Sequence, residues 1–379
     1  MIKIKLREDL IYLLILFIVT FLRNLESIIL FYGRDEYRFD IPFIILFLKT
    51  LGTFIGGLAL YIYHINSFRK KKIIKYFGIG VIRNRVKIKA KDGYLKKVIL
   101  IFFAGFFDFH EFIIANFFII PLDSKIIGPK IECVSTITSS LICIYALRFK
   151  IGKHHKFSLT GLSICFCLAL IIELIYKPED DSIGIFLFTF FLICLNHINI
   201  SFTDCIERYL VNYNFLNPFF VLMIEGIIEF IFSIFYSINK DPFNEFTIHY
   251  KTSSTGQFIF LIFLLVLYFL LNGAVSVYKI YCNCYYSPMA KSLTEYFFDP
   301  LFRIFYFLIM KDFQNNYFYF CMSELICVLQ DFFCCVYNEY LILTCCGLEY
   351  DTKYAISERA LVSDIYNINI EEDDETSNE

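Results

Sequence analysis

The 379-residue chain has no tryptophan, only eight prolines and five methionines, and a charged fraction of just 19%. Without tryptophan, the anchoring of helices at a membrane surface falls to tyrosine. The low charge and the 58% share of apolar residues exclude an ordinary soluble domain, in which about 45–50% of residues are apolar. A chain with this much apolar surface is expected to lie in a lipid bilayer.

Enzyme signatures are missing as well. His110-Glu111 lacks the second histidine of a zinc-protease motif, and no Gly-x-Ser-x-Gly pattern occurs. Most of the fourteen cysteines lie in apolar runs, where cysteine behaves as a small hydrophobic residue. We therefore predict no catalytic residues, no metal site, no cofactor and no nucleic-acid partner.

Apolar windows of about 20 residues, the length that crosses the hydrocarbon core of a bilayer, occur ten times. The first lacks a small-residue cleavage site and is interpreted as a span. The last is expected to continue as a helix through 340–343. The windows predict an all-α polytopic membrane protein with ten transmembrane helices at 10–31, 41–65, 98–121, 126–147, 157–176, 182–204, 217–238, 258–280, 287–310 and 317–336.

Basic residues favour one side of these windows. Loops on the N-terminal side hold 22 lysines and arginines, and the opposite loops hold seven. Because an excess of basic residues marks the cytosolic side, both termini are expected in the cytosol of an integral, multi-pass membrane protein. The densest basic stretch, 69–97, either binds anionic lipid headgroups or only sets the topology. The organelle and the oligomeric state are left open.

Ten spans with both ends on one side divide into five plus five, which is the arithmetic of an inverted repeat. Segments 128–136 and 287–295 support this division, since each opens a span with proline, then lysine, then a hydroxyl residue. The expected organisation is a cytosolic N-terminus at 1–9, a first half at 10–156 with the basic loop and the turn to span 5, spans 5–10 at 157–346, and a disordered acidic tail at 347–379.

Four features accompany the ten-span plan. They are Asn116 followed by Gly128-Pro129-Lys130, the basic turn 147–156, the small-residue run 158–163 and the segment 286–293. Together they resemble the drug/metabolite transporter superfamily, in particular its EamA-like and nucleotide-sugar-transporter-like members. The resemblance covers roughly 100–345. It implies a secondary active transporter that moves a small polar or anionic metabolite, such as a nucleotide-sugar-like solute, by alternating access. A non-transporting structural or trafficking protein and a membrane-embedded enzyme remain as alternatives.

Ionisable side chains within the spans are candidates for a solute or ion path, because each costs about 2.5–3.5 kcal/mol to insert without a partner. Asn116 and Asn272 are added, since they precede the two similar segments by similar distances. Charges recur every four residues in the ninth span, which Pro300 is expected to kink. They either line a path or form a ladder that pairs Lys291 with Glu295 and Asp299 with Arg303. The candidates are Lys291, Glu295, Asp299, Arg303, Lys130, Glu132, Asp108, Glu111, Asn116 and Asn272.

The candidate path fits two modes of coupling. Lysine and arginine suit an anionic group of the solute, whereas buried carboxyl groups suit a coupling proton. Exchange and proton symport therefore both stay open. His154 and His155 fall in the basic turn and are interpreted as polar surface.

Overall fold

The structure is a computed structural model, which describes part of the chain. The described residues are 4–6, 17–18, 21–22, 25, 42–70, 75–76, 80–83, 86–115, 131, 133–176, 183–238, 244, 247–248, 250–251, 253–285, 287–296, 300, 317–352 and 355–356.

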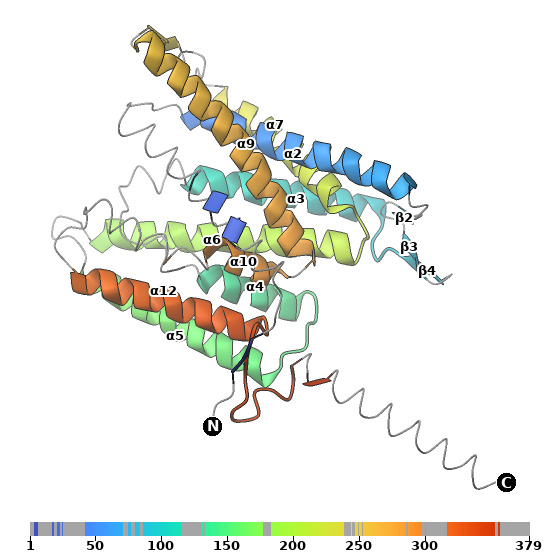
Figure 1. Cartoon of the computed structure of the whole chain (residues 1–379), viewed down its shortest axis with the longest axis vertical. Coiled ribbons are helices and arrows are strands. Elements are labelled where there is room, and N and C mark those ends of the chain that lie inside the picture. The colour runs from blue at the N-terminus through green and yellow to red at the C-terminus, as the bar shows by residue number, and fades with distance from the viewer. Residues whose placement is uncertain are drawn as a thin grey trace.

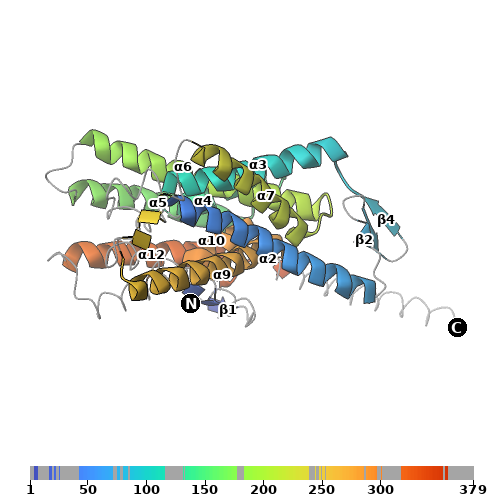
Figure 2. The ribbon, with the colours of Figure 1, turned by 90° about the horizontal axis from the view of Figure 1, so that it is seen from above.

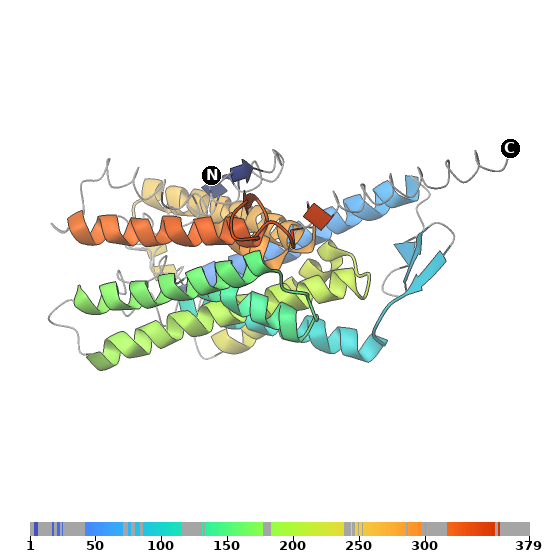
Figure 3. The same ribbon diagram turned by 90° about the horizontal axis from the view of Figure 1, so that it is seen from below.

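Helices dominate this part of the chain and extend along one common direction, except that α9 runs obliquely across its neighbours in Figure 1. The same elongated arrangement is seen from above and below (Figures 2 and 3). The helices are α2 (Pro42–Lys70), α3 (Tyr94–Ile113), α4 (Cys133–Tyr145), α5 (Lys153–Ile175), α6 (Ile183–Asn212), α7 (Pro218–Ser237), α9 (Thr255–Tyr285), α10 (Pro288–Tyr296) and α12 (Tyr317–Tyr337).

Short strands form two small antiparallel sheets outside the helical body. Strands β2 (Lys75–Tyr76), β3 (Gly80–Arg83) and β4 (Val86–Lys89) form a sheet between α2 and α3 that projects beyond the helix ends in Figure 3. Strand β1 (Ile4–Leu6) pairs with β5 (Leu341–Leu343), with Ile4 opposite Leu343. The second sheet joins the N-terminal segment to the segment that follows α12.

Six of the described helices are long and apolar enough to cross a membrane. They comprise Phe43–Asn66, Lys153–Ile175, Ile183–Asn212, Pro218–Ser237, Thr255–Cys284 and Phe318–Tyr337. The distribution of side chains agrees with a lipid surrounding. On α9, Ile259, Phe263 and Val266 are more than half exposed, while Thr50 and Thr53 of α2 are buried. An apolar exterior around a polar interior is the pattern that a bilayer favours and water does not.

Glycines allow α2 to pack closely against α7 and α9. A Cβ added at Gly57 would lie 2.7 Å from the backbone nitrogen of Met223, and one at Gly226 would lie 2.6 Å from that of Phe54. Gly52 of α2 and Gly273 of α9 make a similarly close contact. A Cβ on Gly273 would lie 2.9 Å from the Gly52 carbonyl oxygen. Small residues at such contacts let helix backbones approach, which is how membrane helices gain van der Waals contact.

Several predicted boundaries need correction. Residues 341–343 form a strand rather than a continued helix, because Glu339 adopts a left-handed φ of 60° and the Tyr340 amide donates to the Cys335 carbonyl at 2.9 Å. This is the Schellman arrangement that ends helices. The predicted loop 205–214 is helical as far as Asn212, and the predicted joint 281–286 is helical as far as Tyr285.

Candidate functional site

Buried ionisable side chains gather where α2, α3, α6, α7, α9 and α10 meet. Asp204, Glu207, Glu225 and Glu229 are at most 6% exposed, and Lys291 is equally buried. A buried charge must be paired, hydrogen-bonded or neutralised, because removing it from water is costly. The interactions of these side chains therefore define what the region does.

One group of charges surrounds Lys49 of α2. The Lys49 ammonium donates a hydrogen bond to Asp108 Oδ2 of α3 at 2.8 Å and lies 3.6 Å from Glu229 Oε2 of α7. Glu111, one turn after Asp108, also interacts with Lys49 electrostatically. The Asn272 amide of α9 donates to the Lys49 carbonyl oxygen at 2.8 Å, which fixes this turn of α2. We refer to Lys49, Asp108, Glu111 and Glu229 as the Lys49 cluster.

A second group surrounds Lys291 of α10. The Lys291 ammonium forms an ion pair with Asp204 Oδ1 of α6 and interacts with Glu207 one turn further along α6. The Asn283 amide of α9 donates to the Asp204 carbonyl oxygen at 2.8 Å and to the Glu207 carboxylate. Arg208 holds the end of α9, since its Nη1 donates to the Asn283 carbonyl at 2.8 Å. Lys291, Asp204, Glu207 and Asn283 form the Lys291 cluster.

Glu225 of α7 joins the two clusters. Its carboxyl group interacts with Glu207 of the Lys291 cluster and with Asp108 and Glu229 of the Lys49 cluster. Within the described part of the chain, Glu225 Oε1 and both carboxylate oxygens of Glu229 have no hydrogen-bond partner. The two clusters and Glu225 together form a continuous buried charge network across the helical body.

Carboxyl groups outnumber ammonium groups in this network. Among the described residues, five carboxyl groups interact with Lys49 or Lys291, and a sixth, that of Glu225, interacts with the carboxyl groups of both clusters. Lys279 adds a weaker interaction with Asp108. An excess of buried acid is stable only if protons or cations neutralise part of it. The network can therefore bind an anionic group at its lysines and a cation or proton at its carboxyl groups.

The predicted path residues divide into three groups. Asp108 and Glu111 belong to the Lys49 cluster, Asn272 supports it, and Lys291 centres the other cluster. Glu295 lies in α10, but its side chain falls outside the described residues. The others also lie outside them: Asp299, Arg303, Lys130, Glu132 and Asn116. The proposed stripe is thus described only at Lys291, which forms an ion pair with Asp204 of α6.

Sequence reasoning left out Lys49 and Asp204, which anchor the two clusters. A signal existed for Lys49, because it is the only lysine, arginine, aspartate or glutamate in the predicted span 41–65. Asp204 is the last residue of the predicted span 182–204, so the sequence places it at the boundary of that span. The structure continues α6 for two further turns, so Asp204 and Glu207 lie inside the protein.

No protein-family model matches the chain, and no curated protein sequence is significantly similar to it. The class of the protein therefore comes from its own features. Six long apolar helices with lipid-type exteriors indicate a multi-pass helical membrane protein. Its interior carries a buried charge network.

Proposed function

We propose that the protein is a secondary active transporter that moves a small polar or anionic metabolite across a membrane by alternating access. The observation that carries this proposal is the buried charge network. Charges at this depth are costly in a protein that only needs to span a bilayer, and ionisable groups within membrane helices typically mark solute and ion pathways. The burial and the composition of the network support this proposal.

The proposed architecture is ten spans in two inverted halves of five, with both termini in the cytosol. The described helix contacts support it. If α2 to α5 are spans 2 to 5 and α6, α7, α9, α10 and α12 are spans 6 to 10, each of α2 to α5 has a counterpart five spans later. Counterparts pack together as α2 with α7, α4 with α10 and α5 with α12. The contact of α2 with α9 likewise has its counterpart in that of α7 with α3. This is the pattern of a pseudo-two-fold axis.

The Lys49 cluster joins the two proposed halves. Lys49 and Asp108 belong to the first half and Glu229 to the second. Sites at the interface between repeats become accessible from alternate sides when one half rocks against the other. An anionic solute would bind at Lys49 or Lys291 by displacing a carboxylate partner. In proton symport the displaced carboxylate would take up a proton, and in exchange a second anionic solute would take the place of the first on the lysine. Exchange and proton symport both agree with this scheme.

A solute screen on the purified protein tests the proposal. The full chain is reconstituted into liposomes, and uptake of labelled phosphorylated sugars, nucleotide sugars, carboxylates and amino acids is compared with empty liposomes, with and without a pH gradient. We expect saturable uptake of one polar or anionic class. If the protein is correctly folded and oriented but no class is taken up, the structural or trafficking alternative replaces the transporter.

Anionic lipid is the second partner that we propose, bound where the basic segment 69–97 enters α3. Residues from α3, α4 and α6 line an open cavity of about 330 Å³ there, including Lys91, Lys96, Leu100, Ile142, Phe202 and Tyr209. The Lys91 ammonium lies 5.2 Å from the Tyr209 and Tyr213 ring centroids. Lysines at the mouth of an apolar cavity suit a phospholipid whose acyl chain fills the cavity and whose phosphate meets the ammonium groups.

Asp92 holds one of these lysines in place. Against the effect of desolvation, hydrogen bonds from Lys96, Tyr209 and Asn214 lower the pKa of Asp92 to about 2. Asp92 therefore stays ionised at neutral pH and pairs with Lys96 at 2.8 Å. Lys91 adds a further positive charge, so the mouth of the cavity is positively charged overall. Asn214 fixes Asp92 through two hydrogen bonds, of 2.9 and 3.0 Å.

Removing both lysines is expected to weaken the binding of anionic phospholipid. Each basic residue near a membrane surface contributes about 1 kcal/mol, so Lys91→Gln with Lys96→Gln predicts roughly 30-fold weaker binding. Native mass spectrometry of the protein with phosphatidylserine and phosphatidylcholine measures the change. The matched control is Lys150→Gln with Lys156→Gln, since these lysines are exposed and do not line the cavity. Equal loss in both double variants would mean that only overall charge matters.

A further inference from the structure

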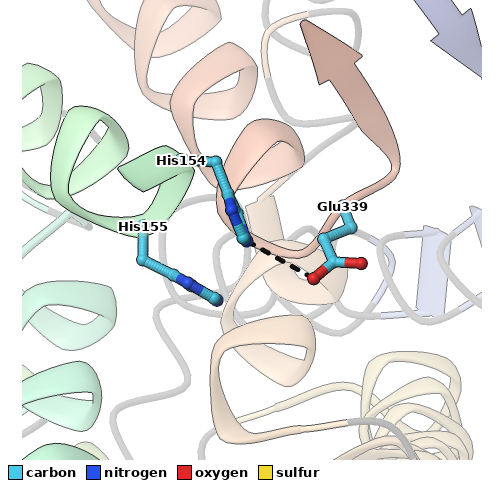
Figure 4. Close-up of side chains that lie close together, drawn as sticks. All are labelled: His154, His155 and Glu339. Atoms are coloured by element: carbon cyan, nitrogen blue, oxygen red, sulfur yellow. Dashed lines mark ion pairs between the residues drawn. The ribbon is translucent and has the colours of Figure 1, made fainter. Parts of the chain in front are cut away.

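A compact group of ligand-type side chains lies at the start of α5, away from the buried charge network. His154 and His155 lie in the first turn of α5, and Glu339 follows the end of α12 (Figure 4). One potential ligand atom from each residue lies within 4.8 Å of those from the other two. The two imidazole ring centroids are 3.9 Å apart. The prediction that these histidines form polar surface is wrong for His154, because it is 2% exposed.

The burial of His154 is chemically unusual. Within the described residues neither of its ring nitrogens makes a hydrogen bond, although Nε2 lies 3.4 Å from Glu339 Oε1. A neutral imidazole always carries one N–H, and a buried polar group without a partner costs about 1–3 kcal/mol. The ring fits only because residue 152 is glycine, whose added Cβ would lie 2.9 Å from His154 Cε1. The protein thus makes room for an imidazole whose nitrogens its own hydrogen bonds leave unsatisfied.

Glu339 is held in an equally specific manner. Its backbone is left-handed, with φ of 60°, a conformation that is uncommon for residues other than glycine. This conformation ends α12, and Figure 4 shows the Glu339 carboxylate directed toward the His154 ring. Unfavourable backbone conformations persist where the surroundings require them, often at binding sites. Two imidazoles and a carboxylate form the His₂Glu ligand set of zinc sites that keep one position open.

We propose that His154, His155 and Glu339 bind a divalent transition-metal ion, with Zn²⁺ as the best match. The ion would supply the electrophilic partner that the His154 ring nitrogens lack, and the Glu339 carboxylate would offset part of its charge. Metal–nitrogen distances are about 2 Å, so binding would draw the three side chains closer together. The fourth position is left for water or for a further ligand.

Binding also changes one hydrogen bond of His155. The Gly152 amide donates to His155 Nδ1 at 3.1 Å, so the neutral ring carries its proton on Nε2. Ligation through Nδ1 would displace the Gly152 amide, and ligation through Nε2 would first move the proton to Nδ1. In either case the Gly152 N–H loses this acceptor. Metal binding should therefore alter the environment of the Gly152 amide, which gives it a local signature.

The consequence of the site is a cross-link between segments that are distant in sequence. Strand β5, which pairs with β1, begins two residues after Glu339. Helices α5 and α12 already pack along their length, and Phe333 of α12 fills the space above Gly161 of α5. A metal at the proposed site would fasten the end of this helix pair together with the β1–β5 sheet. This role does not depend on transport.

Zn²⁺ and Co²⁺ binding to the purified full chain tests the proposal. Competition with a chromogenic chelator measures Zn²⁺ affinity and stoichiometry, and the visible spectrum of Co²⁺ reports the ligand type. We expect one Zn²⁺ per chain, a Co²⁺ spectrum of nitrogen and oxygen ligands, and a melting temperature that Zn²⁺ raises. Loss of a ligand is expected to weaken binding by more than about 100-fold, since even outer hydrogen-bond partners account for about 10–100-fold.

The variants are His154→Gln, His155→Gln and Glu339→Gln, with His110→Gln as the matched control from another part of the fold. Glu339→Gln keeps the shape of its side chain, so it remains informative if His154→Gln fails to fold. Two results would overturn the proposal. One is the absence of Zn²⁺ binding, which leaves only a His154–Glu339 ion pair. The other is binding through thiolates, with their near-ultraviolet Co²⁺ bands, that persists in all three variants.

Discussion

Replacing Lys49 with methionine is expected to lower the free energy of unfolding by about 3–5 kcal/mol, because it leaves Asp108 and Glu229 buried without their cation. Methionine keeps the length and much of the volume of the lysine stem, so the loss reports the charge. Thermal or denaturant unfolding of the protein in a mild detergent measures it. The exposed Lys251 of the same chain provides the matched lysine-to-methionine control, with an expected change within about 0.5 kcal/mol.

Neutralising the partners should reverse most of this loss. The triple variant Lys49→Met, Asp108→Asn and Glu229→Gln removes the uncompensated charge and is expected to unfold close to the wild-type midpoint. A triple variant that is less stable than Lys49→Met would contradict the assignment, since the carboxyl groups would then be stabilising without Lys49.

The second large effect concerns the contact between α2 and α7. Gly226→Ala is expected to destabilise the protein by about 1–3 kcal/mol, because the new methyl group would lie 2.6 Å from the backbone nitrogen of Phe54 and the helices must separate. Gly256→Ala, at the start of α9, is the matched control. An added Cβ there has no atom within 4 Å, so alanine should stabilise the helix by up to about 1 kcal/mol. The two variants are expected to shift the unfolding midpoint in opposite directions relative to wild type. Equal shifts would contradict the close contact.

Hydropathy predicted the helices where the apolar run and the helix coincide. The window 217–238 matches α7 and 317–336 matches α12 to within a residue or so at each end, because Asn217 caps α7 and Glu339 ends the second segment. Prediction was poorer where a helix continues past its apolar run. Helix α6 extends to Asn212 through Asp204, Glu207 and Arg208. Each of these side chains has an ion-pair or hydrogen-bond partner inside the protein, whereas their charges in the sequence predict a loop.

The candidate site was predicted in part. Charge within an apolar window identified Asp108, Glu111 and Lys291, and the position before the segment 287–295 identified Asn272. Sequence could not assign their partners, because Lys291 meets Asp204 across 87 positions and Lys49 meets Asp108 across 59. Spacing of four along one helix is compatible with a path lining or a local ladder at Lys291, and it gives no sign of the tertiary ion pair with Asp204. The burial of His154 was missed for the same reason, since Glu339 approaches it from the other end of the chain.

Glu225 links the two clusters and is the position at which a path and a purely structural network differ most. It interacts with three other carboxyl groups, and its Oε1 has no hydrogen-bond partner among the described residues. A neutral glutamine there removes like-charge repulsion, so Glu225→Gln should fold with at least wild-type stability. If the network only holds the helices together, solute uptake by the Glu225→Gln variant should be unchanged.

Solute uptake by Glu225→Gln in liposomes, measured beside wild type at equal protein and equal orientation, is therefore the most direct test of the central claim. We predict a variant of undiminished thermal stability whose uptake falls by about 10-fold or more. A 10-fold loss of uptake corresponds to about 1.4 kcal/mol of lost stabilisation of the transport step. Wild-type uptake by the stable variant, at every pH gradient, would contradict a transport pathway through the buried charge network.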